Sequence, residues 1–378
     1  MRLLQLLLAL ADVLFAAELV HIQSIWRHGD RVPVGTFPTD PNQRSAWPVR
    51  WGGITNTGML QLFHQGLRLK ERYIDELQEF NPRFQIHVQS SDTDRTLISA
   101  YAFMAAFYSE SRSTYPTAFR WPKDWTPIPV HTVSVGNDPL LVPWMEHCPR
   151  RGELMSIQES NPEYAAFQNE NQPFAEELSE KSGWNLTDFN TFVFFSDLLY
   201  VEKLHNLSFA PWITDEVYEK VEKIRYDAWD YRFGEAGFGR TENAELVALN
   251  GGRLLQQLID NMLSARDRRS QIRYHAYSAH DMTISSLFYT LGAKQAIVGR
   301  RLPEYAASVV LELWKDDENE FVVRLLYSSN STSPLTTVTP AISGCSDSDF
   351  CPLETFIARS AKYAFRQSEL QKLCAAKA

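Results

Sequence analysis

Arg27 and Arg31 bracket His28 in the segment RHGDRVP, residues 27–33. Guanidinium groups stay charged at physiological pH and match pairs of phosphate oxygens. An imidazole is a good nucleophile when neutral, and neighbouring positive charge favours the neutral form by lowering its pKa. The pattern therefore predicts an anion site in which His28 attacks a phosphorus atom. The alternative is a solvated basic loop with a tight turn at Gly29.

Arg95 lies in a second segment, SSDTDRTLISA (residues 90–100), in which Asp92 or Thr93 suits the N-cap of a helix. A helix N-terminus favours an anion because its N–H groups are free and its dipole is positive there. An arginine in the first turn is therefore unfavourable unless an anion binds beside it. The alternative is a surface arginine paired with Asp92 or Asp94.

A third segment, YSAHDMT (residues 277–283), places His280 beside Asp281. A protonated Asp281 would give its proton to a departing alcohol, and His280 would donate a hydrogen bond to a phosphoryl oxygen. Because a carboxyl group acts as an acid only while it holds a proton, this role predicts a rate optimum at acidic pH. The alternative is structural, since Asp is a favoured N-cap residue and a helix is expected to begin here.

Each of the three segments follows a predicted strand and precedes or begins a predicted helix. The strands are expected near residues 19–26, 84–89 and 273–279. Strand followed by helix, repeated, indicates an α/β domain. The carboxyl ends of strands in such a sheet line the ligand crevice, so the three segments are expected to meet at one site.

Residues 148–241 are rich in Glu, Asn, Trp and Phe and show helical periodicity with few strand patterns. We interpret them as a helical insertion that forms a small cap. The α/β catalytic domain then comprises residues 18–147 and 242–378. A long helix is expected over residues 242–263, interrupted at Gly251-Gly252.

Residues 308–314 and 321–327 predict a β-hairpin whose turn is the acidic run KDDENE. We interpret this run as a solvated hairpin tip. The alternative is a calcium site.

The composition excludes some classes of function. The chain has 378 residues, of which 44% are hydrophobic, and its net charge is −9. It is long enough for a substantial core. A long nucleic-acid groove is not expected, because phosphate backbones require a basic face. The motifs GxxxxGK, HExxH and GxSxG are absent from the sequence.

Residues 1–17 predict a secretory signal peptide, with Arg2 before an apolar run that ends in small residues. The alternative is a buried N-terminal strand. No later stretch predicts a membrane anchor, so we expect a secreted, extracellular protein; the alternative is the lysosomal lumen. Three glycosylation sequons fit this route, at Asn185, Asn206 and Asn330.

Four cysteines also fit an oxidising compartment. They allow three pairings. Cys345 and Cys351 flank a short polar segment, which favours a local disulfide and leaves Cys148 to pair with Cys374. A zinc site is the weaker alternative, because no CxxC pair is present.

RHGDRVP, followed by TFPTDP at residues 36–41, resembles the histidine acid phosphatase family, and so do the second and third segments. HTV (131–133), HCPR (147–150) and GCSDSDFCPLETF (344–356) are similar to the same family. The resemblance covers residues 20–374. It is closer to the prostatic and lysosomal branch than to phytases, which usually carry Asn where this chain has Thr283.

The resemblance implies a mixed central sheet flanked by helices, as in phosphoglycerate mutase, with a helical cap insertion. It implies that His28 becomes a phosphohistidine and that Asp281 is the general acid. Substrate contacts would come from Arg27, Arg31, Arg95 and His280. Small-molecule or peptide phosphomonoesters would be hydrolysed without a metal or other cofactor. Because members of the family often form homodimers, the resemblance also implies a homodimer.

Three other functions were weighed against this one. A phosphoglycerate-mutase-like transferase fits poorly with a secretory signal. Phytate specificity would need more Lys and Arg in the cap. An inactive secreted binding protein is disfavoured because all the expected catalytic residues are present.

Overall fold

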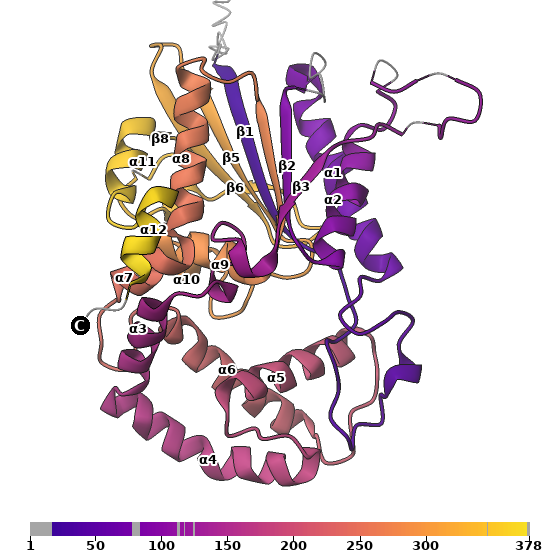
Figure 1. The fold of residues 1–378 in the computed structure, drawn as a ribbon, viewed down its shortest axis with the longest axis vertical. Helices are drawn as coiled ribbons and strands as arrows, with labels where there is room; N and C mark the ends of the chain where they lie inside the picture. Colours follow the sequence, from indigo (N-terminus) through magenta and orange to yellow (C-terminus); the bar gives the residue numbers. More distant parts are fainter. Residues whose placement is uncertain are drawn as a thin grey trace, which may run out of the picture.

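The chain folds around a mixed β-sheet with helices on both faces (Figure 1). The computed structural model describes residues 17–77, 84–111, 114–116, 118–123, 125–345 and 347–375. In this part of the chain the strand order is β3-β2-β4-β1-β5-β6-β7, with β8 beside β6. The strands are β1 Glu18–Arg27, β2 Ile86–Ser91, β3 Val130–Val133, β4 Tyr274–Ala279, β5 Ser308–Lys315, β6 Phe321–Ser328, β7 Thr336–Thr337 and β8 Cys351–Pro352. The predicted mixed α/β fold is confirmed, whereas the predicted signal peptide lies outside the described residues except for its last position.

The four strands β1 to β4 run parallel, and β5 runs antiparallel to β1. The carboxyl ends of β1, β2 and β4 therefore lie at one edge of the sheet. The amino end of β5 joins them there because its direction is reversed. Every loop that leaves this edge can contribute to the same site.

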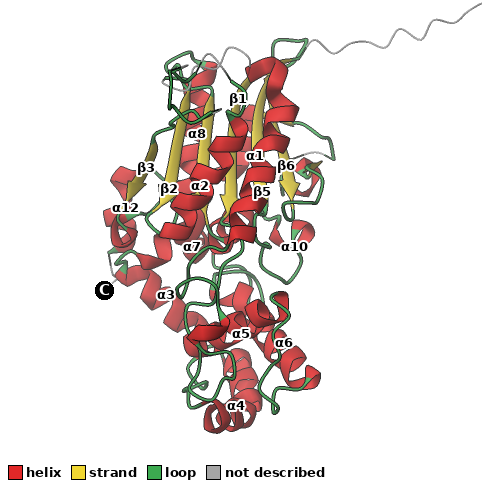
Figure 2. Cartoon of the chain, turned by 90° about the vertical axis from the view of Figure 1, so that its right-hand side faces the viewer, coloured by secondary structure: helices red, strands yellow, loops and turns green. Residues whose placement is uncertain are grey.

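Alternate side chains of β1 enter different hydrophobic cores. Ile22 and Trp26 pack towards α1 and α2, whereas Ile25 packs towards α8 and α9. Figures 1 and 2 show α1 and α2 side by side on one face of the sheet. The helices of the two layers are α1 Asn56–Leu77, α2 Asp94–Phe107, α7 Ala244–Val247, α8 Arg253–Arg266, α9 Asp281–Thr290, α10 Lys294–Ile297, α11 Leu353–Ser360 and α12 Gln367–Cys374. Short 3₁₀ turns occur at Arg44–Ala46, Val135–Asn137, Pro143–Met145 and Thr339–Ala341.

The helix expected over residues 242–263 is interrupted at the predicted glycine pair. A π-helical turn over Ala248–Gly252 separates α7 from α8. A Cβ atom on Gly251 would lie 2.3 Å from the carbonyl oxygen of Ser286 in α9. Glycine at this position therefore allows α9, whose first residue is Asp281, to pack close to the interrupted helix.

The cap contains four helices, which lie beyond the carboxyl edge of the sheet (Figures 1 and 2). They are α3 Pro149–Glu159, α4 Pro162–Ser182, α5 Phe189–Leu204 and α6 Asp215–Arg232. Phe37, from the connection between β1 and α1, is fully buried in the core of the cap. Thr39 of the same connection donates a hydrogen bond to the carbonyl oxygen of Lys181, at 2.7 Å. This connection thus packs with the cap, and the domain boundaries drawn from the sequence stay a prediction.

All four cysteines are paired. The Cys148–Cys374 disulfide joins the start of α3 to the end of α12, and the Cys345–Cys351 disulfide closes the loop before α11. No thiol remains for the zinc site that the sequence left open. The predicted hairpin is also present as β5 and β6. In the turn between β5 and β6, a carboxylate oxygen of Asp316 accepts hydrogen bonds from the N–H groups of Glu318 and Glu320, which fits a hairpin tip.

A hydrogen bond to Glu202 links α5 to the connection between β1 and α1. The Glu202 side chain is buried and accepts a 2.9 Å hydrogen bond from the Asn42 amide. Burial, together with the neighbouring Asp40 carboxylate, raises the pKa of Glu202 to about 8. The folded chain thus holds a proton that the unfolded chain releases between about pH 4.5 and 8. The contribution of Glu202 to the free energy of unfolding should therefore fall as pH rises across this window.

We expect Glu202→Gln to remove much of this pH dependence, because an amide imitates the protonated carboxyl group. The variant should be more stable than the wild type at pH 8 by roughly 2–4 kcal/mol and closely similar at pH 4. Urea unfolding at both pH values measures the difference. Equal stability changes at the two values would show that Glu202 is ionised in the folded chain.

Candidate active site

The three segments singled out in the sequence meet at the carboxyl edge of the sheet. The His28 N–H donates to the carbonyl oxygen of Ala279, at 3.0 Å, which holds the end of β1 beside the end of β4. The hydroxyl of Ser91, the last residue of β2, lies 2.9 Å from Nε2 of His280. The ring centroids of His28 and His280 are 5.5 Å apart. The sheet register therefore brings together His28 and His280, which are 252 positions apart in the sequence.

His28 is buried and has a defined tautomer. Its Nδ1 lies 2.8 Å from the carbonyl oxygen of Gly29. Because a carbonyl oxygen only accepts hydrogen bonds, Nδ1 carries the proton and Nε2 keeps its lone pair. Burial, followed by the charges of Arg95 and Arg27, lowers the pKa of His28 well below its usual value. The imidazole is therefore neutral and nucleophilic even in acid.

The turn after His28 depends on a close approach of two glycines. A Cβ atom on Gly29 would lie 2.1 Å from the carbonyl oxygen of Gly58, and one on Gly58 would lie 2.2 Å from that of Asp30. Asp30 accepts hydrogen bonds from the Thr55 hydroxyl at 2.5 Å and from the His205 ring at 3.0 Å. These contacts fix the loop between the start of α1 and the end of α5.

Arg27 is held between a carboxylate and an aromatic ring. Its guanidinium lies 2.9 Å from a carboxylate oxygen of Asp281 and 4.2 Å from the centroid of Tyr305. It also donates to the carbonyl oxygen of Pro303, at 2.7 Å. Burial lowers the pKa of Arg27, but Asp281, Tyr305 and Tyr200 together outweigh that effect and raise the pKa overall. Arg27 thus stays charged beside the side chain of Asp281.

Arg31 and Arg95 differ in their partners. Arg31 makes a two-pronged ion pair with Asp197 of α5, at 3.0 and 2.8 Å. Arg95 has no hydrogen bond among the described side chains, and its Nε is buried without a partner. Burial and the charge of Arg31 lower the pKa of Arg95 to about 10, which still leaves it charged at neutral pH. A partly buried guanidinium without a carboxylate partner favours a bound anion.

His280 stands opposite His28 and is also neutral. Burial, followed by the charges of Arg95 and Arg27, lowers its pKa well below the usual value. Its ring is 7% exposed. The backbone N–H of His280 donates to the Thr283 hydroxyl, at 3.3 Å, and that hydroxyl donates to the carbonyl oxygen of Leu141. The start of α9 is thereby fixed at the site.

The structural alternatives for the three segments are wrong. The loop after β1 is not solvated, because Arg27, His28 and Arg31 are all less than 9% exposed. Arg95 does not pair with Asp94, which instead forms an ion pair with Arg50. The N-cap residue of α9 is His280, and Asp281 is the first residue of the helix.

The geometry combines a neutral nucleophilic nitrogen, three guanidinium groups and a carboxyl group in one buried site. The guanidinium charges suit a dianionic tetrahedral group such as a phosphoryl ester. The same charges repel a metal cation, and the described residues contain no cluster of three or more ligands for one. The arrangement is suited to transferring a phosphoryl group to nitrogen.

A model of the histidine phosphatase superfamily (branch 2) matches residues 18–328. The chain belongs to this superfamily. Lysosomal acid phosphatase of Xenopus laevis is 33% identical over 340 residues, covering 90% of this chain and 75% of that protein. Prostatic acid phosphatase of Bos taurus is 34% identical over 348 residues, covering 90% of this chain and 84% of that protein. The chain is therefore an enzyme of the acid phosphatase family, and phosphomonoesters are its class of substrate.

Solved structures of phytases share the fold. The apo form of Hafnia alvei phytase aligns with a TM-score of 0.63 at 15% identity, covering 96% of this chain and 99% of that one. The phytase of Citrobacter braakii aligns with a TM-score of 0.61 at 15% identity, covering 95% of this chain and 100% of that one. At these identities the likeness concerns the fold alone.

Sequence reasoning missed several residues of this histidine phosphatase site. Tyr305 lies just before β5. Because β5 runs antiparallel to β1, its amino end lies beside the carboxyl end of β1. Placing the first strand of the predicted hairpin antiparallel to β1 would therefore have put Tyr305 at the site. Asp197 lies inside a cap helix, and no local motif marks it. His205, which no motif in the sequence marks, contacts Asp30 of the nucleophile loop.

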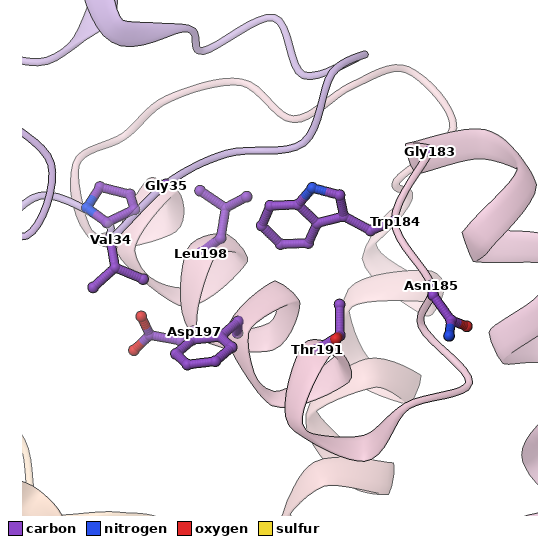
Figure 3. A pocket seen from close by; sticks show the side chains of 10 residues that line it. Val34, Gly35, Gly183, Trp184, Asn185, Thr191, Asp197 and Leu198 are labelled. Carbon is purple, nitrogen blue, oxygen red and sulfur yellow. The ribbon is translucent and has the colours of Figure 1, made fainter.

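A cavity of about 390 Å³ is lined by Asp197 and other residues of the cap (Figure 3). Val34 and Gly35 form one wall, and Trp184 and Leu198 of the cap form another (Figure 3). Asn185, one of the three sequon asparagines, is exposed at its edge. Asp197 connects this cavity to the site, because it lines the cavity and is also the ion-pair partner of Arg31.

Proposed function

We propose that this chain is a secreted acid phosphatase that hydrolyses phosphomonoesters through a phosphohistidine on His28. One observation carries the proposal. Nδ1 of His28 donates to the carbonyl oxygen of Gly29, so that Nε2 keeps its lone pair in a buried site containing three arginines. In this proposal Arg27, Arg31 and Arg95 hold the phosphoryl oxygens, and His280 contacts the same group.

In the first step, Nε2 of His28 attacks phosphorus in line with the departing oxygen. The N–P bond forms while the P–O bond to the leaving group breaks. Asp281 gives its proton to the leaving oxygen, so that an alcohol departs rather than an alkoxide. The arginines stabilise the charge on the three equatorial oxygens.

In the second step, the Asp281 carboxylate accepts a proton from a water molecule whose oxygen attacks phosphorus. The N–P bond breaks, inorganic phosphate is released and His28 returns to the neutral form with Nδ1 protonated. Asp281 is again protonated and ready for the next substrate. Its side chain is 18% exposed, so it can exchange protons with solvent.

The electrostatics of the site support an acidic optimum. The lowered pKa of His28 keeps the nucleophile neutral as the pH falls. Acid also favours the protonated form of Asp281 that the first step requires. The rate should therefore rise as pH is lowered from neutral, until the histidines or the substrate phosphate take up protons.

Two structural features support an oxidising compartment. Both disulfides are formed, which is typical of secreted and lumenal proteins. Asn185 and Asn206 of the sequons are exposed. No helix among the described residues is long and apolar enough to cross a membrane. Secretion and the homodimer stay predictions.

We expect hydrolysis of an aryl phosphate between pH 3 and 9 to peak in acid and to be unchanged by EDTA, because no step uses a metal ion. Initial rates at saturating substrate, with and without the chelator, measure both expectations. A maximum above pH 8, or loss of activity in EDTA that a divalent cation restores, would contradict the proposed mechanism.

A further inference from the structure

A second cavity begins beside Asp281 and leads away from the phosphoryl site. It has a volume of about 140 Å³, and Arg27 and Asp281 form its boundary with the site. His28, Arg95 and His280 do not line it. Under the proposed function, Asp281 protonates the leaving oxygen. The cavity is therefore the space into which the leaving group of a small substrate would extend.

Two further arginines line this cavity, Arg225 from α6 of the cap and Arg301 from the loop before β5. Arg225 is only 5% exposed, and its Nε has no hydrogen-bond partner. Among the residues that the structure describes, its one hydrogen bond goes to the Ser196 hydroxyl, at 3.3 Å. Glu222 reaches Arg225 only through that hydroxyl, which it binds at 2.6 Å.

The carboxylates that line the cavity already have partners. Asp197 is paired with Arg31, and Asp281 with Arg27. Glu304 accepts a 2.8 Å hydrogen bond from the Asn330 amide. Among the described residues, neither Arg225 nor Arg301 has a carboxylate oxygen within ion-pair distance. From farther away, the charge of Arg225 helps to lower the pKa of Asp197, which is itself paired with Arg31. The rings of Tyr226 and Trp229 lie 5.3 and 5.6 Å from the guanidinium of Arg225, and they support its charge without neutralising it.

A buried guanidinium without a counter-ion is unfavourable unless a ligand supplies the missing charge. From this, and resting on the proposed function, we propose that Arg225 and Arg301 form an anion subsite for the leaving group. The preferred substrates are small phosphomonoesters whose alcohol carries a second anionic group, a carboxylate or another phosphate, a few atoms from the ester oxygen. The anion would complete the pairing of Arg225 while Asp281 protonates the ester oxygen.

Phosphoglycolate and ethyl phosphate test this subsite at pH 5.5, because they have closely similar size and differ by one carboxylate. We expect kcat/KM of the wild type to be at least tenfold higher for phosphoglycolate. Arg225→Gln and Arg301→Gln should each lower the phosphoglycolate-to-ethyl phosphate ratio about tenfold, since each removes one charge-assisted contact. Arg301 is exposed, so its variant also tests the subsite if the Arg225 variant fails to fold.

Arg300→Gln is the matched control. Arg300 adjoins Arg301 in sequence, but it is 66% exposed, pairs with Asp227 and does not line the cavity. It should leave both rates unchanged. A wild-type ratio near one, or variants that slow both substrates equally, would overturn the subsite while leaving the phosphatase proposal intact. Failure of the wild type to hydrolyse ethyl phosphate and aryl phosphates would instead overturn the proposed function.

Discussion

Replacing His28 with alanine should lower kcat/KM for an aryl phosphate by about 10⁴-fold or more, because the variant has no nucleophile to form the covalent intermediate. The fold should persist, since the side chain makes a single hydrogen bond, to the carbonyl oxygen of Gly29. The same variant should also fail to retain labelled phosphate when it is denatured in alkali, where an N–P bond survives. Initial rates and retained label measure the two effects separately.

His64→Ala is the control for this substitution. His64 is exposed on α1, so its loss should change neither rate nor label. Added imidazole offers a further test, because it can occupy the space that alanine leaves and attack phosphorus itself. Rescue that depends on imidazole concentration would support nucleophilic attack by His28. Full activity in His28→Ala, or label retained by that variant, would remove His28 as the nucleophile.

The position of this site was predictable because it depends on sheet topology. A buried strand followed by polar residues occurs three times, and parallel strands bring their carboxyl ends to one edge. His28, Arg95 and His280 therefore meet, whatever the details of the loops. Local patterns identified those strands, and the register of β1 with β4 then fixed the distances.

The residues that sequence reasoning missed come from packing between distant elements. Asp197 and Arg225 lie within cap helices. In the sequence, neither residue can be distinguished from the charged residues on a solvated helix face. Only the docking of the cap places them beside the site. The pairing of Arg31 with Asp197 leaves Arg95 as the guanidinium without a partner, which no local motif indicates.

The titratable groups of the fold give opposite pH dependences of stability. Burial lowers the pKa of His275 to about 3, so the folded chain excludes a proton that the unfolded chain binds below about pH 6.5. Stability from this group is lost as pH falls. Glu202, with its pKa raised to about 8, has the reverse effect and loses stability as pH rises. The two effects together favour maximal stability between about pH 4.5 and 6.5.

Asp281→Asn should lower kcat by about 10²- to 10⁴-fold for an alkyl phosphate and much less for p-nitrophenyl phosphate. An alkoxide is a poor leaving group and needs a proton as the P–O bond breaks, whereas p-nitrophenolate departs readily without one. Asparagine keeps the size of the side chain and an oxygen that can accept the Met282 N–H. The difference between the two substrates therefore reports proton donation rather than lost structure. The rate for the alkyl ester should also lose its decline with rising pH.

Asp197→Asn separates this role from a general loss of charge at the site. Asp197 pairs with Arg31 as Asp281 pairs with Arg27, but in the proposed mechanism it gives no proton to the leaving group. Its substitution should slow both esters by the same factor, because it disturbs only an arginine that holds the phosphoryl oxygens. If Asp281→Asn also slows both esters equally, Asp281 serves to position Arg27, and the general acid must be another group or a water molecule. If only the alkyl ester is slowed, the proton comes from Asp281, and the Arg27–Asp281 contact holds the acid beside the phosphate that Arg27 binds.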